Sequence, residues 1–465
     1  MTSRQPVLRS STSFHNKVWP SEFRALLALA IPVVLSELGW MAMTVVDTIM
    51  VGGLGPVAIG SVAVGSFVYY SPALFGIGIL LGLDTLVSQA HGRGDFDECH
   101  RWLAQSVYLA AAYTPICMLL AFGATRLFPF WGVNVAVGVG AAHYLSILNW
   151  STLPLLLYAA ARRYLQGVGR ATPVTFALLS ANVVNLAGNW VLINGRLGLP
   201  AMGVRGSALS TCIARVYMAG VLLFVAWRYE SKRGHQLFGH WPGPELARLR
   251  PLLRLGLPAA GQILMEVGAF AAATVMAARL APEALAAHQI ALNCASLSYM
   301  VPLGVSAAAA VSVGHAVGAR DGARARRAGW MALAAGVSFM ALAASLFLLI
   351  PRPILRVYST DPGIRRLGVP LLALAGIFQI FDGIQTVSTG ALRGLGETRM
   401  PMLANLFGYW CFGLPLGYAL CFRAKWGIFG LWLGLTLALI LISIAVLQEW
   451  IRKSRHLASF FMEKR

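Results

Sequence analysis

Charged residues are scarce in this sequence, and that scarcity excludes a water-soluble protein. Asp, Glu, Lys and Arg together make up 12% of the 465 residues, hydrophobic residues make up 58%, and the mean hydropathy is +0.69. Soluble domains carry roughly 25% charged residues, which cover their surface. We therefore expect an integral membrane protein.

The sequence also lacks the motifs of metal, nucleotide and disulfide chemistry. Its nine His form neither HExxH nor HxH, and Gly167-Val168-Gly169 follows an apolar run and not the strand that a nucleotide-binding loop needs. Its six Cys are scattered without paired spacing, which predicts neither a disulfide framework nor a zinc site. We expect no cofactor and no enzymatic activity, and without an ATP site any transport would depend on an ion gradient.

Long apolar runs, in contrast, are abundant. A helix that crosses a membrane needs about 20 mostly apolar residues. Twelve such runs are present, at 26–50, 57–88, 103–124, 137–160, 172–193, 205–227, 253–278, 284–313, 330–350, 367–390, 401–421 and 427–449. The run that follows the polar residues 1–24 is too long for the core of a signal peptide, so we expect a retained first helix.

The second half of the chain repeats the first. The repeated elements lie at a nearly constant offset in residue number, and they are Pro32 and Pro258, Leu54-Gly55-Pro56 and Leu280-Ala281-Pro282, His91 and His315, Trp102 and Trp330, Leu165-Gln166-Gly167-Val168-Gly169 and Leu392-Arg393-Gly394-Leu395-Gly396, and Pro173 and Pro401. Such an offset indicates an internal duplication. The predicted fold is an all-α integral membrane protein of twelve transmembrane helices in two pseudo-symmetric six-helix lobes.

The duplication also predicts the domain organisation. We expect a cytoplasmic N-terminal tail at 1–25, an N-lobe at 26–227, a polar cytoplasmic linker at 228–252, a C-lobe at 253–449 and a cytoplasmic C-terminal tail at 450–465. With six spans per copy, both lobes enter the membrane in the same orientation, so an axis along the membrane normal relates them. Such halves are typical of a transporter that rocks around a central site.

The net charge of +20 is explained by topology and requires no nucleic acid. With the N-terminus inside, the inner loops and tails hold 26 Lys and Arg, the outer loops hold 10, and Arg215 lies within a span. This asymmetry predicts a multi-pass protein of the plasma (inner) membrane with both termini in the cytoplasm. The basic clusters expected to meet anionic lipid headgroups are Arg162-Arg163, Lys232-Arg233 with Arg248, Arg250 and Arg254, and Arg324-Arg326-Arg327.

Acidic residues inside the spans are the strongest functional signal. Asp47, Glu266 and Asp382 lie in spans 1, 7 and 10, and none is matched by an acid in the other copy. An ionised group at the bilayer centre costs about 2.5–3.5 kcal/mol, and burial raises the pKa of a carboxyl group toward the range in which it can exchange protons. The alternative is a protonated, hydrogen-bonded structural carboxyl group.

Polar residues at helical spacing accompany these acids. In span 10, Gln379, Asp382, Thr386 and Thr389 share one face, which we expect to point inward. The i,i+4 pair Asn185 and Asn189 of span 5 can supply oxygens beside Asp47, and Thr211 of span 6 can add another. Gln289 and Asn293 of span 8 form a similar pair. The alternative for these pairs is hydrogen bonding between helices, worth under about 1 kcal/mol per bond.

Five motifs in order along the chain carry a family resemblance. They are Met43-Thr44-Val45-Val46-Asp47-Thr48-Ile49-Met50-Val51-Gly52, Met265-Glu266-Val267, Ala286-Ala287-His288-Gln289-Ile290-Ala291-Leu292-Asn293, Met300-Val301-Pro302-Leu303-Gly304 and Ala391-Leu392-Arg393-Gly394-Leu395-Gly396. They resemble the multidrug and toxin extrusion (MATE) family, nearest its NorM-like bacterial branch, over nearly the whole chain. The resemblance implies an antiporter that expels organic cations in exchange for Na⁺ or H⁺.

The resemblance also implies roles for the acids. In such proteins the acid of span 1 and the pair of span 5 form an N-lobe cation site, which matches Asp47, Asn185 and Asn189 and makes them possible Na⁺ ligands. The acids of spans 7 and 10 form a C-lobe site, which matches Glu266 and Asp382.

The chain departs from the family at two positions. Some relatives carry an acid where this chain has Asn189. Asp84 is an additional acid near the inner end of span 2, either a paired structural residue or part of a proton path. Pro32, in contrast, resembles the family proline at which helix 1 can bend, and the alternative is a static kink.

Lipophilic cations fit the predicted site because carboxylates and aromatic rings both attract them. Candidate contacts are the polar residues Gln289, Asn293, Gln379 and Thr386 and the aromatic residues Trp40, Phe67, Tyr69, Tyr70, Phe270 and Tyr299. We favour H⁺ over Na⁺ as the coupling ion and expect a monomer. The alternative within transport is a flippase for lipid-linked or amphipathic precursors, which usually needs a strongly cationic cavity.

Overall fold

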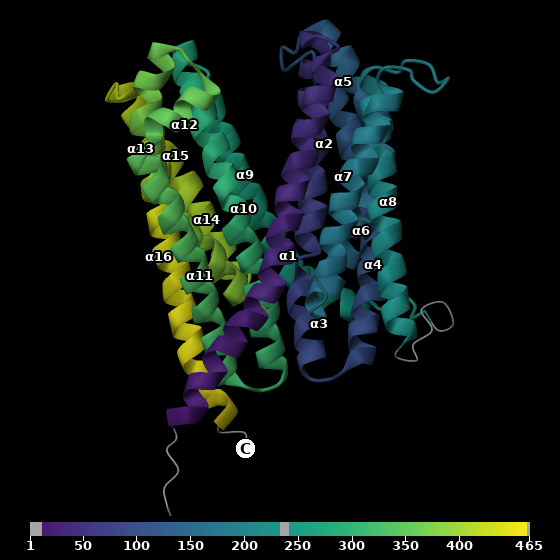
Figure 1. The fold of residues 1–465 in the computed structure, drawn as a ribbon, viewed down its shortest axis with the longest axis vertical. Helices are drawn as coiled ribbons and strands as arrows, with labels where there is room; N and C mark the ends of the chain where they lie inside the picture. The colour runs from purple at the N-terminus through teal and green to yellow at the C-terminus, as the bar shows by residue number, and fades with distance from the viewer. Residues whose placement is uncertain (1–11, 233–240, 463–465) are drawn as a thin grey trace, which may run out of the picture.

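The computed structural model describes residues 12–232 and 241–462, and within them the chain is helical without a single strand (Figure 1). The first half forms α1 (Thr12–Gly52), α2 (Pro56–Ile79), α3 (Gly82–Gly92), α4 (Phe96–Thr125), α5 (Val135–Leu148), the 3₁₀ turn η1 (Asn149–Ser151), α6 (Thr152–Gly167), α7 (Thr172–Leu192) and α8 (Val204–Ser231). The second half forms α9 (Leu246–Ala277), α10 (Pro282–Gly318), α11 (Gly322–Leu349), α12 (Pro351–Tyr358), α13 (Pro362–Gly394), α14 (Arg399–Asn405), the π-helix η2 (Leu406–Gly413), α15 (Leu414–Tyr418), the π-helix η3 (Ala419–Arg423) and α16 (Gly427–Met462).

These elements make twelve membrane spans, as the sequence predicts. Eleven described helices are long and apolar enough to cross a membrane, counting α2 with α3 and α5 with α6 as single spans. The twelfth is Arg399–Arg423, where α-helical and π-helical pieces alternate and each piece alone is shorter than a span. The short α12 lies between spans 9 and 10. The predicted spans therefore match the structure, although most helices extend several residues beyond the apolar runs.

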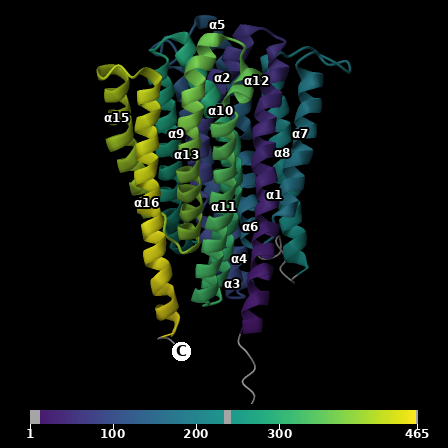
Figure 2. The same ribbon diagram turned by 60° about the vertical axis from the view of Figure 1, so that its left-hand side comes forward.

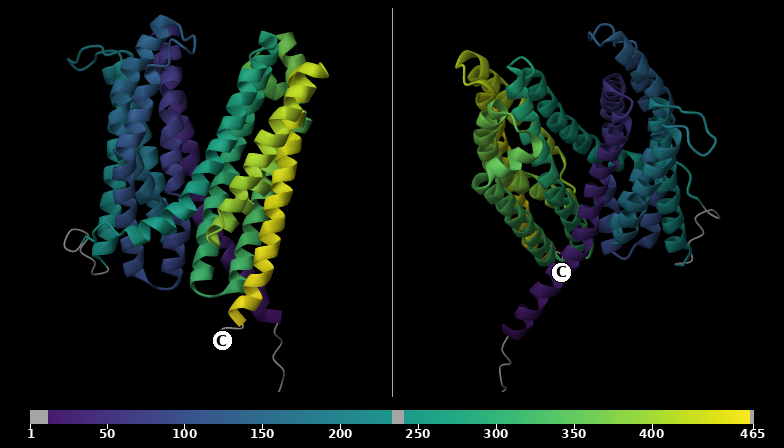
Figure 3. Two further views of the ribbon diagram at one scale, coloured as in Figure 1. Left: turned by 180° about the vertical axis from the view of Figure 1, so that it is seen from behind. Right: turned by 45° about the horizontal axis from the view of Figure 1, so that its top comes forward.

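The spans form two lobes with separate cores. One core is built from residues of α1 to α8 together with Leu252, and the other mainly from residues of α9 to α16. Figures 1 and 3 show the lobes far apart at one end and close together at the other. The end at which they meet carries the start of α1, the end of α8 and the end of α16, and it is called the terminal end below (Figure 2).

Helix α1 packs against both lobes. Near the terminal end, Leu26 and Ala30 belong to the core of the second lobe, and Glu22 forms an ion pair with Arg327 of α11 at 2.9 Å. Farther along, Met43 and Val51 belong to the core of the first lobe. Helix α1 therefore crosses from one lobe to the other along its length.

Two symmetry-related glycine contacts join the lobes. A Cβ on Gly78 of α2 would lie 2.5 Å from the Cα of Ala260 on α9, and one on Gly304 of α10 would lie 2.5 Å from Cγ2 of Val34 on α1. One offset in residue number relates Gly78 to Gly304 and Val34 to Ala260. The duplicated halves thus meet through one contact made twice, which requires small residues at both places.

The basic clusters differ in their surroundings. The prediction that Arg162 and Arg163 lie among lipid headgroups is wrong, because both point into the protein: Arg162 is 7% exposed and bonded to Glu37, and Arg163 pairs with Asp84. Lys232, Arg250, Arg254, Arg324 and Arg326 are exposed, whereas Arg248 pairs with Glu98 and Glu245, and Arg327 pairs with Glu22. Residues 233–240 of the predicted linker, which include Arg233, and the outer parts of both predicted tails lie outside the described residues.

Candidate functional site

The N-lobe acid sits in a compact polar cluster. Asn189 of α7 donates a hydrogen bond from Nδ2 to Oδ1 of Asp47 on α1 at 2.6 Å, and Thr211 of α8 donates to Oδ2 at 3.3 Å. Asn189 also donates to Oδ1 of Asn185, one turn earlier, at 3.2 Å. All four side chains are at least nine-tenths buried. The structure therefore brings together the four residues that the sequence grouped, from three helices.

Two atoms of this cluster have no hydrogen-bond partner among the described residues. They are Nδ2 of Asn185 and Oδ1 of Asn189, both fully buried. A buried polar group without a partner is costly, so the cluster can accept a further small polar guest. Carboxylate and amide oxygens are the kind of ligand that hard cations such as Na⁺ bind. The same carboxylate can instead hold a proton.

A buried cation lies on the same helix as Thr211. Arg215, one turn farther along α8, is 1% exposed and donates to Oγ of Ser151 at 2.7 Å and to the hydroxyl of Tyr70 at 3.1 Å. Its guanidinium carbon also lies 4.7 Å from the ring centre of Tyr69. The N-lobe therefore holds a buried arginine one helical turn from Thr211, which contacts Asp47.

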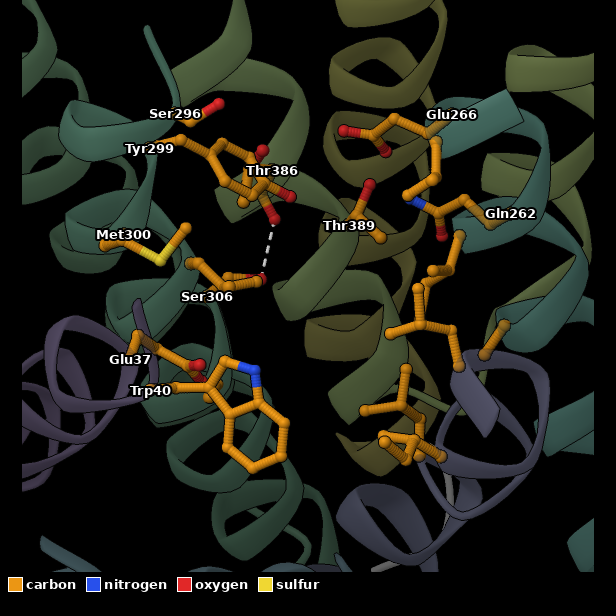
Figure 4. Close-up of a pocket in the computed structure, with 18 of the residues that line it drawn as sticks. Glu37, Trp40, Gln262, Glu266, Ser296, Tyr299, Met300, Ser306, Thr386 and Thr389 are labelled. Atoms are coloured by element: carbon orange, nitrogen blue, oxygen red, sulfur yellow. Dashed lines mark hydrogen bonds between the residues drawn. The ribbon is translucent and has the colours of Figure 1, made fainter. Parts of the chain in front are cut away.

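A second site is a cavity of about 510 Å³ between the lobes. Helices α1, α2 and α6 line it from the first lobe, and α9, α10 and α13 line it from the second. Figure 4 shows Glu266, Tyr299, Thr386 and Thr389 around this space, with Glu37 and Trp40 of α1 at one end of it. Each lobe thus contributes part of one common wall.

The predicted C-lobe acids both line this cavity. Glu266 receives a long 3.5 Å hydrogen bond from Nε2 of Gln385, and neither Glu266 nor Asp382 forms an ion pair with any residue in the described parts of the chain. Tyr299 lines the same cavity as the two acids. When ionised, the two carboxylates would attract a cation that enters the cavity.

The polar face of span 10 points inward, as the sequence predicts. Gln379, Asp382, Thr386 and Thr389 are all buried. Asp382, Thr386 and Thr389 line the cavity, whereas Gln379 bonds to Ser298 of α10. Gln379 therefore links two helices in this structure.

The other candidate substrate contacts divide into two groups. Trp40, Phe270 and Tyr299 line the cavity. Gln289 and Asn293 are exposed and do not line it, and the aromatic residues that lie elsewhere are Phe67, Tyr69 and Tyr70. A role in binding substrate for Gln289 and Asn293 stays a prediction.

Sequence reasoning missed a charged pair in the cavity wall. Glu37 of α1 bonds to Arg162 of α6, and one turn along the same helices Trp40 stacks on Tyr158, with ring centres 6.2 Å apart. All four residues line the cavity. Glu37 lies within the same apolar run as Asp47, so the search for charges inside spans could have found it.

Asp84 is an ion-paired residue and not an isolated acid. Its Oδ2 lies 3.1 Å from Nη1 of Arg393 and 3.5 Å from Nη1 of Arg163, and its side chain is 1% exposed. Arg163 belongs to the same lobe as Asp84, whereas Arg393 belongs to the other. The ion pairs account for the burial of Asp84 beside the cavity.

Outside the spans, Glu397 completes the lining next to Arg393. Burial acts to raise the pKa of Glu397, but a hydrogen bond from Lys453 and backbone N–H groups of Met400 and Arg399 outweigh it and hold the pKa below its usual value. Glu397 therefore remains charged at neutral pH. It ties the α13–α14 connection to α16.

Two duplicated six-span lobes around a shared cavity define the class of two-lobed membrane transporters. Within it, the MatE family model matches residues 32–191 and 258–419, one stretch in each lobe. This chain belongs to the MatE family.

Relatives and solved structures agree with that assignment. The chain is 37% identical to a "Probable multidrug resistance protein NorM" of Mesorhizobium japonicum over 446 residues, covering 94% of this chain and 95% of the relative. It is 34% identical over 450 residues to the protein of the same name in Brucella suis, covering 95% of each.

Two solved structures have the same fold at 19% sequence identity. The eukaryotic MATE transporter AtDTX14 superimposes with a TM-score of 0.83, covering 95% of this chain and 99% of that one. A multidrug resistance MATE transporter in an outward-facing conformation superimposes with a TM-score of 0.84, covering 94% and 96%. The chain is therefore an integral multi-pass membrane protein with the MATE fold.

Proposed function

We propose that this protein is a secondary active multidrug efflux transporter that exports organic cations in exchange for an ion. The observation that carries the proposal is the cavity between the lobes. There Glu266 and Asp382, which have no basic partner in the described parts of the chain, lie beside Trp40, Phe270 and Tyr299. Carboxylates and aromatic faces together attract lipophilic cations. The names of the NorM relatives support the same function.

The terminal end is the cytoplasmic side in this proposal, since the positive charge of the loops favours that orientation. The lobes are then closed toward the cytoplasm and apart on the outer side. An ion that arrives from outside neutralises the carboxylates, weakens their hold on the drug and releases it outward. The two cations compete for the same charge, so each lowers the affinity for the other. The site is complete within one chain, so the cycle needs only a monomer.

The flippase alternative receives no support from the charges of the cavity. Three arginines line it, Arg162, Arg163 and Arg393, and each is paired with Glu37 or Asp84. A phosphate headgroup would therefore have to displace a buried carboxylate, while the acids without basic partners would repel it.

We propose H⁺ as the coupling ion. A tight Na⁺ site requires several oxygen ligands and an ionised carboxylate that no other cation offsets. Asp47 shares its lobe with the buried Arg215 and already accepts two hydrogen bonds. A proton requires only a carboxylate in surroundings that disfavour its charge. The N-lobe oxygens remain the leading Na⁺ ligands if the proton proposal fails.

Efflux of a fluorescent organic cation from proteoliposomes tests both proposals. We expect an imposed pH gradient alone to drive efflux, and drug binding to weaken as the pH falls because protonation removes the attracting charge. Adding Na⁺ at constant ionic strength should change binding far less. Displacement of the drug by Na⁺ at fixed pH, together with no efflux under a pH gradient, would establish Na⁺ coupling instead. No gradient-driven transport of any organic cation would contradict the proposed function itself.

A further inference from the structure

The lobes exchange two equivalent hydrogen bonds at the terminal end. Gln89 of α3 donates from Nε2 to the carbonyl oxygen of Gly394 in α13 at 2.9 Å, and His315 of α10 donates from Nε2 to the carbonyl oxygen of Gly167 in α6 at 2.7 Å. At the offset of the glycine contacts above, His315 takes the position of Gln89, whereas the sequence comparison paired it with His91. The acceptors occupy the same place in the duplicated Leu-x-Gly-x-Gly motif, which thus lies at the contact between lobes.

The backbones approach closely at the same place. A Cβ on Gly92 would lie 2.2 Å from the carbonyl oxygen of His315, and one on Gly318 would lie 2.1 Å from that of Gln89. The offset that relates Gln89 to His315 also relates these two glycines. The symmetric part of the contact therefore consists of bare backbone and one side-chain hydrogen bond from each lobe.

The ion pairs break this symmetry. Asp84 of α3 binds Arg393 of the other lobe at 3.1 Å and Arg163 of its own lobe at 3.5 Å. At the offsets of the duplication, Ala310 stands where Asp84 would be repeated and Gln166 stands where Arg393 would be. The ion pair between Asp84 and Arg393 therefore has no counterpart on the other side. On that side Thr85, next to Asp84, also donates to the carbonyl oxygen of Arg393.

This one-sided contact lies next to the cavity. Arg163 and Arg393 are both lining residues, and Asp84 holds them together. If the lobes separate at this end, Arg393 leaves with α13, whereas Arg163 stays with Asp84. The N-lobe then retains a neutral pair, and water that enters from the same side can solvate Arg393, so the contact can be broken and remade.

We propose that Asp84 is a positioning residue of the transport cycle: by binding Arg393 across the lobes it holds the terminal end closed beneath the cavity. The proposal rests on the proposed transport function only in treating opening at this end as part of the cycle. An ion pair that only stabilised the fold would serve equally well within one lobe. This one joins the two bodies that have to move apart.

Spin labels at the terminal end measure this opening without any substrate. The labels are attached to cysteines that replace Arg101 on α4 and Arg324 on α11, both exposed. Cys212 and Cys411 are changed to Ala so that they take no label, and the other four natural cysteines are buried. In Asp84→Asn we expect the ratio of short to long inter-label distances to fall by about tenfold, equivalent to about 1.4 kcal/mol. Asp84→Glu should restore most of the short-distance population.

Two further variants test the pairing. Arg393→Gln should shift the distances as Asp84→Asn does, and the double variant should shift them no further, because the two side chains act as one unit. Asp321→Asn is the matched control. Asp321 is an exposed acid at the same end that caps α11 within its own lobe, so its replacement should leave the distances unchanged.

The result that overturns the proposal is an unchanged distance distribution in Asp84→Asn, whether or not its melting temperature falls. If that variant does not fold, Thr85→Val replaces it, because it removes one contact to Arg393 without leaving a buried charge unpaired. We expect a smaller shift of the distances in the same direction. An unchanged distance distribution in Thr85→Val would then overturn the proposal. The measurement uses neither drug nor gradient, so its failure is distinct from a failure of the efflux assay.

Discussion

Replacing Glu266 by Gln, or Asp382 by Asn, is expected to reduce gradient-driven efflux about 30-fold or more while leaving the protein inserted and folded. The physical reason is that each variant removes a charge from the cavity without changing the shape of the side chain. Loss of one partner from a buried charge interaction costs about 2–5 kcal/mol, and these two acids are the lining acids that have no basic partner among the described residues. Initial efflux rates in proteoliposomes at matched protein content measure the effect.

Glu283→Gln is the matched control for these variants. Glu283 is an exposed acid of the same lobe, at the start of α10, and it does not line the cavity. Its loss should leave efflux unchanged. Wild-type rates in both Glu266→Gln and Asp382→Asn would remove the C-lobe acids from the mechanism.

The second large effect is expected at the N-lobe cluster. Asp47→Asn and Asn189→Ala should each impair efflux strongly, and the double variant should be little worse than either single one. Asn189 donates directly to Asp47 at 2.6 Å and joins it to Asn185, so the residues act on one guest. Contacting residues typically show coupling energies of about 0.5–3 kcal/mol in such cycles. Efflux rates of the four proteins in the cycle give the coupling energy, and a parallel cycle with Asn185→Ala should show the same sign.

Asn182→Ala provides the comparison on the same helix. Asn182 donates to the carbonyl oxygens of Gly39 and Leu178, whereas Asp47 accepts its hydrogen bonds from Asn189 and Thr211. Combined with Asp47→Asn, it should give additive losses. Additive losses for Asn189 as well would mean that Asp47 and Asn189 do not share a site.

Local patterns in the sequence predicted the fold and the acids of both lobes. The apolar runs and the fixed offset of the duplication can be seen in the order of residues alone, without knowledge of how the helices pack. They therefore predicted the twelve spans and the two lobes. Asp47, Glu266 and Asp382 stand out because a charge within an apolar run has few explanations. Helical spacing joined Asn185 to Asn189, and the resemblance placed that pair beside Asp47, where the structure has it.

What the sequence did not predict depends on how distant helices meet. Arg162 and Glu37 are far apart along the chain, and Arg393 and Asp84 are farther apart still, so no local period relates them. Basic residues near the end of a span fit both lipid headgroups and buried acids, and only the packing of the lobes decides between them. The same holds for Gln289 and Asn293: their spacing fixes a common face, but not the surroundings of that face.

The glycine contacts between the lobes bear on the ancestry of the chain. Gly78 meets Ala260 as Gly304 meets Val34, so each half offers one small residue and one partner position. A contact made twice in this way is the arrangement of an isologous dimer, in which the same patch serves both subunits. Two copies of one six-span half, paired in parallel, would meet through this same patch. The Asp84–Arg393 bridge departs from that pattern, since Ala310 and Gln166 occupy the mirrored positions. Within one chain the two halves need not be identical, and the terminal contact is one place where they differ.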